Sequence, residues 1–249
     1  MKCLAIAAMY LFAATAFAQK SSTPAKPSGE AAAVQAMLQA QMPDDQIKAA
    51  EELITKFPAT TYKAYALLTE ANAWEAKGDH AKCVDLCQRA LAADPKDFDA
   101  EILMANVLAG QIVSTDPDKA AKLARAEKAA KDALNVIKTA PKPGLFQMSD
   151  ADWTRMRNYS SMQAWQALGI VAETEDKMDE AVADYEKGIA LTPDAGLMLR
   201  AGRTLEAKQK YDAAISWYDK AIASPDADQQ FKDIAGKDKA RAAAKKANQ

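Results

Sequence analysis

Apolar and small residues recur every three or four positions along most of this chain, the spacing that builds one face of an α-helix. Alanine, leucine, lysine, glutamate and glutamine are abundant, and glycine and proline fall mainly between the periodic stretches. Runs that alternate apolar and polar residues, as a half-buried strand does, are almost absent. The pattern therefore predicts ten or eleven helices and no sheet.

Four dipeptides place a capping side chain before a proline, a combination that favours the first turn of a helix. They are Asp94 with Pro95, Asp116 with Pro117, Thr192 with Pro193, and Ser224 with Pro225. We expect a helix to begin at each of these prolines.

The helical pattern also repeats along the chain. A small residue marks one register position in four units, namely Cys83, Ala126, Ala181 and Ala214. Four residues later stand Cys87, Ala130, Tyr185 and Tyr218, and three residues earlier stand His80, Leu123, Met178 and Tyr211. These offsets lie on one face of a helix, and a second periodic helix precedes each unit. The chain is therefore expected to be a series of helix hairpins.

One unit, 162–193, carries the fullest signature, made of Trp165, Leu168, Gly169, Ala181, Tyr185 and Pro193. These residues stand at the spacings of the tetratricopeptide repeat, and the chain resembles that family over nearly all of its length after residue 29. The resemblance implies an all-α solenoid of helix hairpins over 30–249, with a C-terminal capping helix. The implied repeats are 30–58, 64–95, 98–138, 162–193 and 195–225.

Two segments of this solenoid depart from the repeat. An insertion at 139–161 is expected to extend the helix of Trp165 backwards through its part 150–161. The segment 226–249 is expected to form the capping helix, with Phe231 and Ile234 turned inward and its lysines outward.

The first residues are typical of a secretory signal at 1–18, with Lys2, an apolar run, and Ala16, Phe17 and Ala18 as a small-x-small cleavage site. The run is too short for an ordinary membrane-spanning helix, and Cys3 precedes it, so no lipid anchor is expected. Residues 19–29 are polar, contain two prolines and resemble a flexible leader. We expect an exported protein, periplasmic or secreted, without an integral membrane segment in the mature chain.

Charge narrows the range of partners. Without Lys2 the chain holds 31 basic and 34 acidic residues, a formal charge of −3, so no broad basic field favours nucleic acid. Only the tail from residue 237 is locally basic, which leaves a membrane-surface role open. The oligomeric state is not predicted.

His80, Cys83 and Cys87 share one helix face, a spacing compatible with half of a zinc site. Each nevertheless occupies a register position filled elsewhere by ordinary core residues, and cysteine packs as a small hydrophobe. Residues four apart on a helix hold their Cβ atoms about 5–6 Å apart, whereas a disulfide needs about 3.5–4.5 Å. We expect core packing and keep a thiol or zinc protein using Cys83 and Cys87 as an alternative.

No glycine-rich phosphate loop or nucleophile elbow is present, and a single histidine gives no independent support for a His-based triad. We expect a non-enzymatic scaffold or adaptor, without cofactor or metal, that binds a protein or peptide segment in cell-envelope assembly or maintenance. The family resemblance implies a groove lined by first-helix side chains: Asn72, Glu75, Asn106, Gln166, Glu173, Arg200 and Arg203.

A more specific ligand is an alternative. Asn72, Asn106 and Arg200 match positions at which related repeat proteins grip the carboxylate at a chain's C-terminus, although Leu68 stands where those proteins carry lysine. On this alternative the arginines supply positive charge and the asparagines bind the ligand backbone.

Overall fold

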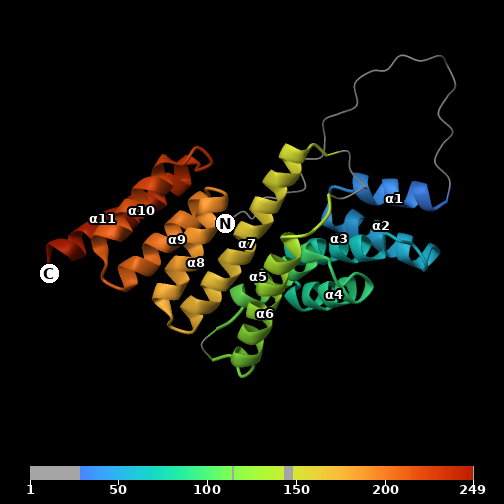
Figure 1. The fold of residues 1–249 in the computed structure, drawn as a ribbon, viewed down its shortest axis with the longest axis horizontal. Coiled ribbons are helices and arrows are strands. Elements are labelled where there is room, and N and C mark those ends of the chain that lie inside the picture. The colour runs from blue at the N-terminus through green and yellow to red at the C-terminus, as the bar shows by residue number, and fades with distance from the viewer. Residues whose placement is uncertain (1–28, 114, 143–147, 249) are drawn as a thin grey trace, which may run out of the picture.

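The structure is a computed structural model that describes residues 29–113, 115–142 and 148–248. Eleven α-helices and no strand lie within these residues (Figure 1). Their bounds are α1 Glu30–Gln39, α2 Pro43–Lys56, α3 Lys63–Ala76, α4 His80–Ala93, α5 Phe98–Gly110, α6 Lys119–Ile137, α7 Asp150–Thr174, α8 Met178–Leu191, α9 Ala195–Ala207, α10 Tyr211–Ala223 and α11 Gln229–Ala247. The predicted signal and leader lie outside the described residues, apart from Gly29.

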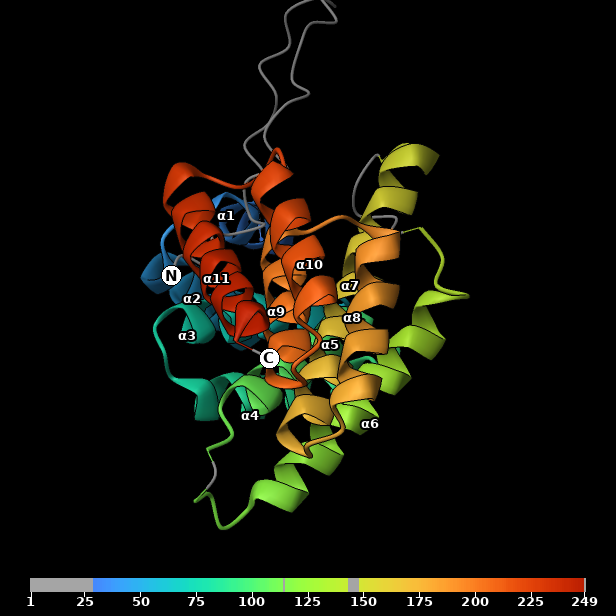
Figure 2. The same cartoon turned by 90° about the vertical axis from the view of Figure 1, so that its left-hand side faces the viewer.

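The helices pair into five antiparallel hairpins that follow one another along an all-α solenoid (Figures 1 and 2). Within a hairpin the first helix packs on the second, and the second helix packs on the first helix of the next hairpin. The last helix, α11, packs on α10 and closes the C-terminal end. The fold predicted from the repeat pattern is confirmed.

Two glycines leave room for a tyrosine ring of the paired helix in the last two hairpins. A Cβ atom added at Gly169 in α7 would overlap the ring of Tyr185 in α8. The same relation recurs one repeat later, where a Cβ atom at Gly202 would lie 2.5 Å from the ring of Tyr218. Both tyrosines are fully buried, so each glycine is required by the ring that fills its space.

The insertion lengthens one helix, as expected. Helix α7 begins at Asp150, twelve residues before the unit that starts at residue 162, and it packs on α5 as well as α6. Trp153 is buried in its first turns, with its ring centroid 6.3 Å from that of Phe98. The insertion therefore adds core on the α5 side of the solenoid.

The prediction that helices begin at the proline dipeptides is wrong. Helices α5, α9 and α11 begin two to four residues later, where the side chains of Asp97, Asp194 and Asp228 accept hydrogen bonds from backbone N–H groups of the first turn. Asp94 and Thr192 instead follow the last residues of α4 and α8. The dipeptides at 94–95, 192–193 and 224–225 follow the second helix of a hairpin, where proline cannot continue that helix, whereas Asp116 and Pro117 lie in the loop between α5 and α6.

The inward face of the capping helix also differs from the prediction. Phe231 is partly buried against the core, but Ile234 is 39% exposed. The buried positions of α11 are Ala235, Asp238 and Ala242, whose spacing of three and four residues defines one helix face. This face is narrow and carries a carboxylate, so α11 is held by ion pairs as well as by apolar contact.

Candidate functional site

All seven residues predicted to line a groove stand on first helices of hairpins. They are Asn72 and Glu75 on α3, Asn106 on α5, Gln166 and Glu173 on α7, and Arg200 and Arg203 on α9. The structure brings Glu173 and Arg200 into contact across two neighbouring hairpins. Among these seven residues no other pair is joined by a hydrogen bond or ion pair.

Arg200 is the centre of a small network. Its Nη2 and Nε atoms lie 2.6 and 2.8 Å from Glu173 Oε2, and Nε also lies 2.9 Å from the hydroxyl of Tyr185. The hydroxyl of Thr204 donates to the other carboxylate oxygen of Glu173. Burial raises the pKa of Tyr185, so its hydroxyl stays protonated at neutral pH. Three helices thus hold one guanidinium in a defined position.

Arg203 belongs to a second network, which sequence reasoning missed. Its Nε lies 2.6 Å from Asp238 of α11, and the other oxygen of Asp238 pairs with Arg241 at 2.6 Å. Arg241 also binds Glu206 through two parallel contacts of 2.8 Å. Both acids are almost completely buried, so this network fastens the capping helix to α9.

Glu206 has further partners, because Lys245 lies 2.9 Å from its carboxylate and the hydroxyl of Tyr218 donates at 2.8 Å. The hydrogen bond from Arg241 is the largest influence, and it helps to lower the pKa of Glu206 to about 2. A signal for this site exists in the sequence, since Glu206 occupies the repeat position equivalent to Glu173, 33 residues later, near the end of the next first helix.

The two asparagines use their amides within the fold. The Nδ2 group of Asn72 donates to the Leu68 carbonyl of its own helix at 2.9 Å. The Nδ2 group of Asn106 donates to the carbonyls of Ile102 at 3.0 Å and Gln163 at 3.2 Å, which ties α5 to α7. Neither amide N–H₂ group is left wholly available to a ligand, which weakens the carboxylate-clamp alternative.

Cys83 and Cys87 are both fully buried, with free thiols, inside the main core. The predicted core packing of this pair is confirmed. The neighbouring Cys83 and burial raise the pKa of the Cys87 thiol well above its usual range, so it is a poor nucleophile. No group of three or more His, Cys, Asp or Glu side chains is arranged to hold a metal in the part of the chain that the structure describes.

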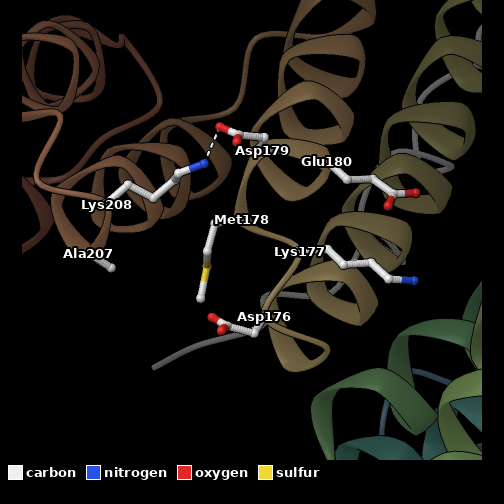
Figure 3. A pocket seen from close by; sticks show the side chains of 7 residues that line it. All are labelled: Asp176, Lys177, Met178, Asp179, Glu180, Ala207 and Lys208. Carbon is white, nitrogen blue, oxygen red and sulfur yellow. Dashed lines mark ion pairs between the residues drawn. The ribbon is translucent and has the colours of Figure 1, made fainter.

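A shallow hollow lies beside the turn from α7 to α8 (Figure 3). Its lining includes Asp176, Met178 and Lys208, and the ammonium group of Lys208 pairs with Asp179. Lys210 lies 3.1 Å from the same carboxylate, whereas Asp176 and Glu180 of the lining have no ion pair within the described residues. This hollow lies between the turn that joins α7 to α8 and the end of α9 in the next hairpin.

No helix within residues 29–113, 115–142 and 148–248 combines the length and apolarity needed to cross a membrane.

The comparison with known proteins concerns two hairpins, α7–α8 and α9–α10, and the overall fold. The tetratricopeptide repeat family matches residues 163–194 and 195–226. TTC0263, a thermophilic tetratricopeptide-repeat protein of Thermus thermophilus, has a similar structure, with a TM-score of 0.57 and 16% identity over 79% of this chain and 90% of that one. MamA has a TM-score of 0.52 and 16% identity over 78% and 91% of the respective chains. No curated protein matches the sequence.

Proposed function

We propose that this chain, which has the tetratricopeptide-repeat fold and carries two matched repeats at 163–226, is a non-enzymatic scaffold that binds a segment of another protein. The segment would lie along the face formed by the first helices of the hairpins. Binding proteins of this architecture gain area by placing equivalent side chains on successive hairpins. Because many functions share one fold, the proposal rests on the site rather than on the fold alone.

The observation that carries the proposal is the state of Arg200. Its side chain is 43% exposed, yet Glu173 and Tyr185 hold it in place. Its third nitrogen, Nη1, makes no hydrogen bond within the described residues. An arginine fixed in advance loses little side-chain entropy when a ligand arrives. Arg200 is therefore a prepared hydrogen-bond donor on an open surface.

The pairing also indicates what Arg200 would bind. Glu173 already neutralises much of its charge, so a further carboxylate would meet a nearly balanced pair. A backbone carbonyl of a bound segment is uncharged, and it needs only the free N–H groups of Arg200 as hydrogen-bond donors. We therefore favour an internal segment of a protein partner over a chain terminus, and the carboxylate clamp stays as the alternative.

We also propose that the protein is exported and acts in the cell envelope or outside the cell. The support is the charged start, apolar run and small-x-small site within residues 1–18. N-terminal sequencing of the secreted or periplasmic fraction should give a chain that begins at Gln19. A retained signal segment in that fraction would contradict this proposal.

Photo-crosslinking tests the proposed binding face. A photoreactive residue replaces Gln166 on α7 in one variant and the exposed Gln88 on α4, a second helix, in the control. Crosslinked partners from an envelope extract should appear at Gln166 and not at Gln88. Equal crosslinking at the two positions would show that the first-helix face is not the binding surface.

The double variant Arg200→Ala, Arg203→Ala should then weaken capture of the crosslinked partner by about tenfold or more, because the prepared donor is lost. Its matched control is Arg89→Ala, Arg125→Ala, which removes the same charge from exposed arginines on α4 and α6. The controls should retain binding, and helix content should be the same in all variants. Capture that is unaffected by loss of Arg200 and Arg203 would move the site elsewhere.

A further inference from the structure

A second hollow lies on the opposite side of α7 from Gln166 and Glu173. Helices α6 and α8 each pack on α7 but barely touch each other, and between them is a groove of about 660 Å³ with α7 as its floor. Trp165, Leu168 and Ala172, at helical spacing, face this groove. Gln166 and Glu173 do not line it, so the groove is distinct from the face considered above.

The middle of the groove is apolar. Trp165 and Leu134 are only partly buried, and Leu191 is 37% exposed at the edge of α8. The Nζ atom of Lys187 lies 4.3 Å from the centroid of the Trp165 ring and covers part of it. The Lys187 side chain is 51% exposed and also pairs with Asp184 at 2.8 Å. A half-exposed pair of this kind contributes little stability, so a partner's apolar side chain can displace this cover.

One end of the groove carries positive charge that is not neutralised. Within the described residues Arg157 has no ion pair, and its Nε atom is buried without a hydrogen-bond acceptor. Its guanidinium has an aromatic contact, 6.0 Å from the centroid of the Trp153 ring. Lys138 lines the same end and lies 3.3 Å from an amide oxygen, that of Asn135, rather than from a carboxylate.

The other end has the opposite balance. Glu127 pairs with Lys131, and Glu175 pairs with Lys177, so those charges cancel. Glu180 has no ion pair in the described part of the chain and leaves an excess negative charge. The groove therefore has a positive end, an apolar middle and a weakly negative end.

We propose that this groove binds an amphipathic helix of a protein partner, with the acidic C-terminal end of that helix at Arg157 and Lys138. The floor from Arg157 to Glu175 follows eighteen residue steps of α7, roughly 27 Å at 1.5 Å per residue, which suits a helix of about 15–18 residues. A helix carries partial negative charge at its C-terminus and partial positive charge at its N-terminus. This orientation matches both ends of the groove and places the bound helix along α6 and α8.

The same chemistry gives the class of partner. Its apolar side chains would recur at i, i+3, i+4 and i+7 and contact Trp165, Leu134 and Leu191. Glutamate or aspartate in its last turn would pair with the guanidinium group of Arg157 and with Lys138. The first-helix face and this groove could then be occupied together, because they lie on opposite sides of α7.

Two isomeric synthetic peptides test the proposal against the full-length mature chain. Both are helix-forming, carry leucines at i, i+3, i+4 and i+7 spacing and have amidated C-termini; two glutamates stand in the last turn of one and in the first turn of the other. Fluorescence anisotropy at moderate ionic strength gives both dissociation constants. The peptide with C-terminal glutamates should bind at least about tenfold more tightly, the effect of roughly 1.4 kcal/mol.

The variant Arg157→Ala, Lys138→Ala should abolish this preference. The matched control Lys48→Ala, Lys63→Ala removes two exposed lysines from α2 and α3 and should retain it, as should Arg200→Ala with Arg203→Ala. Leu191→Glu, a change at an exposed edge position, should weaken both peptides while circular dichroism stays that of the parent. Equal affinities for the two peptides, or a preference that survives loss of Arg157 and Lys138, would overturn the proposal.

Discussion

The hairpin at 64–95 and the hairpin at 162–193 have the same architecture but fill one shared position in different ways. In the first, Ala71 and Cys87 occupy two facing repeat positions; in the second, Gly169 and Tyr185 occupy them. All four residues are deeply buried. A large ring on the second helix thus goes with glycine on the first, and a small thiol goes with alanine, so the residue on the first helix is smallest where its partner is largest.

The presence of tyrosine in place of cysteine also changes the electrostatics of the contacts between neighbouring hairpins. A buried tyrosine hydroxyl needs a hydrogen-bond partner, and the two tyrosines obtain one from Arg200 and from Glu206. A cysteine or alanine makes no such demand. The C-terminal hairpins are therefore linked by charged networks that reach the next first helix or the capping helix, whereas the hairpin at 64–95 depends at this position on apolar packing.

The largest expected effect comes from adding a methyl group where the tyrosine ring lies. Gly169→Ala should destabilise the protein by about 3 kcal/mol, the upper part of the usual range for overpacking, even though alanine favours a helix. Chemical denaturation followed by circular dichroism measures the loss. Gly236→Ala in α11 is the control, because a Cβ atom there meets nothing within 4 Å and should stabilise by up to about 1 kcal/mol.

Removing the cation that links α11 to α9 should have the next largest effect. Arg241→Ala leaves Glu206 and Asp238 buried with fewer partners, and we expect a loss of about 2 kcal/mol, below the usual cost of breaking a buried pair because Lys245, Tyr218 and Arg203 remain. Melting temperature across a salt series measures it. A parent protein and variant of equal stability would show that apolar contact alone holds the capping helix.

Two acids outside these hairpins, Glu206 on α9 and Asp99 on α5, should make stability respond to pH in opposite directions. The pKa of Glu206 is lowered to about 2, so its stabilising contribution is complete above the unfolded value of about 4.3 and is lost as the pH falls toward 2. The Asp99 residue at the start of α5 is exposed in part, but desolvation of its carboxyl group by the surrounding helices and the nearby Asp97 raise its pKa to about 7. Its contribution is present below about pH 4 and is lost as the pH rises to 7.

Two variants separate the change in stability at acidic pH from the change that extends to neutral pH. Glu206→Gln should reduce the stability lost between about pH 4.3 and 2, and Asp99→Asn should reduce the decline between about pH 4 and 7. Denaturant midpoints measured at each pH give both slopes. If the slope of stability against pH is unchanged in either variant, other groups cause the change in that pH range. Glu101 is one such group, because burial also raises its pKa to about 7.

The smallest of these effects is expected at the thiol position. Cys87→Ala removes one buried sulfur atom and should cost about 1–2 kcal/mol. Both thiols should also resist a thiol reagent until the protein unfolds, because they are fully buried. Rapid labelling of the native protein would contradict the core assignment.

Local patterns were enough to predict the helices, the hairpins and the burial of Cys83 and Cys87. These features depend on spacing within about 30 residues, which the repeat displays directly. The proline dipeptides misled because an aspartate shortly after the proline competes as the cap, as at Asp97 and Asp194. Each alternative is locally acceptable, and the stacking of the hairpins decides between them.

The candidate site was predicted less completely. The positions of Arg200 and Arg203 on first helices followed from the repeat, but their partners did not. Glu173 lies 27 residues before Arg200, and Asp238 lies 35 residues after Arg203, so each pair depends on how neighbouring hairpins stack. Asp238 stands among lysines in α11, so the sequence does not predict its burial. Only its spacing from Ala235 and Ala242 indicates that it shares their buried face.

A double-mutant cycle tests most directly whether the sizes of these two facing residues depend on each other. The variant Gly169→Ala, Tyr185→Cys recreates in the hairpin at 162–193 the pair that Ala71 and Cys87 form at 64–95. If the two positions share one packed volume, the double variant should be more stable than the sum of the single losses predicts, by at least about 1 kcal/mol. Additive losses, within about 0.5 kcal/mol, would contradict the account.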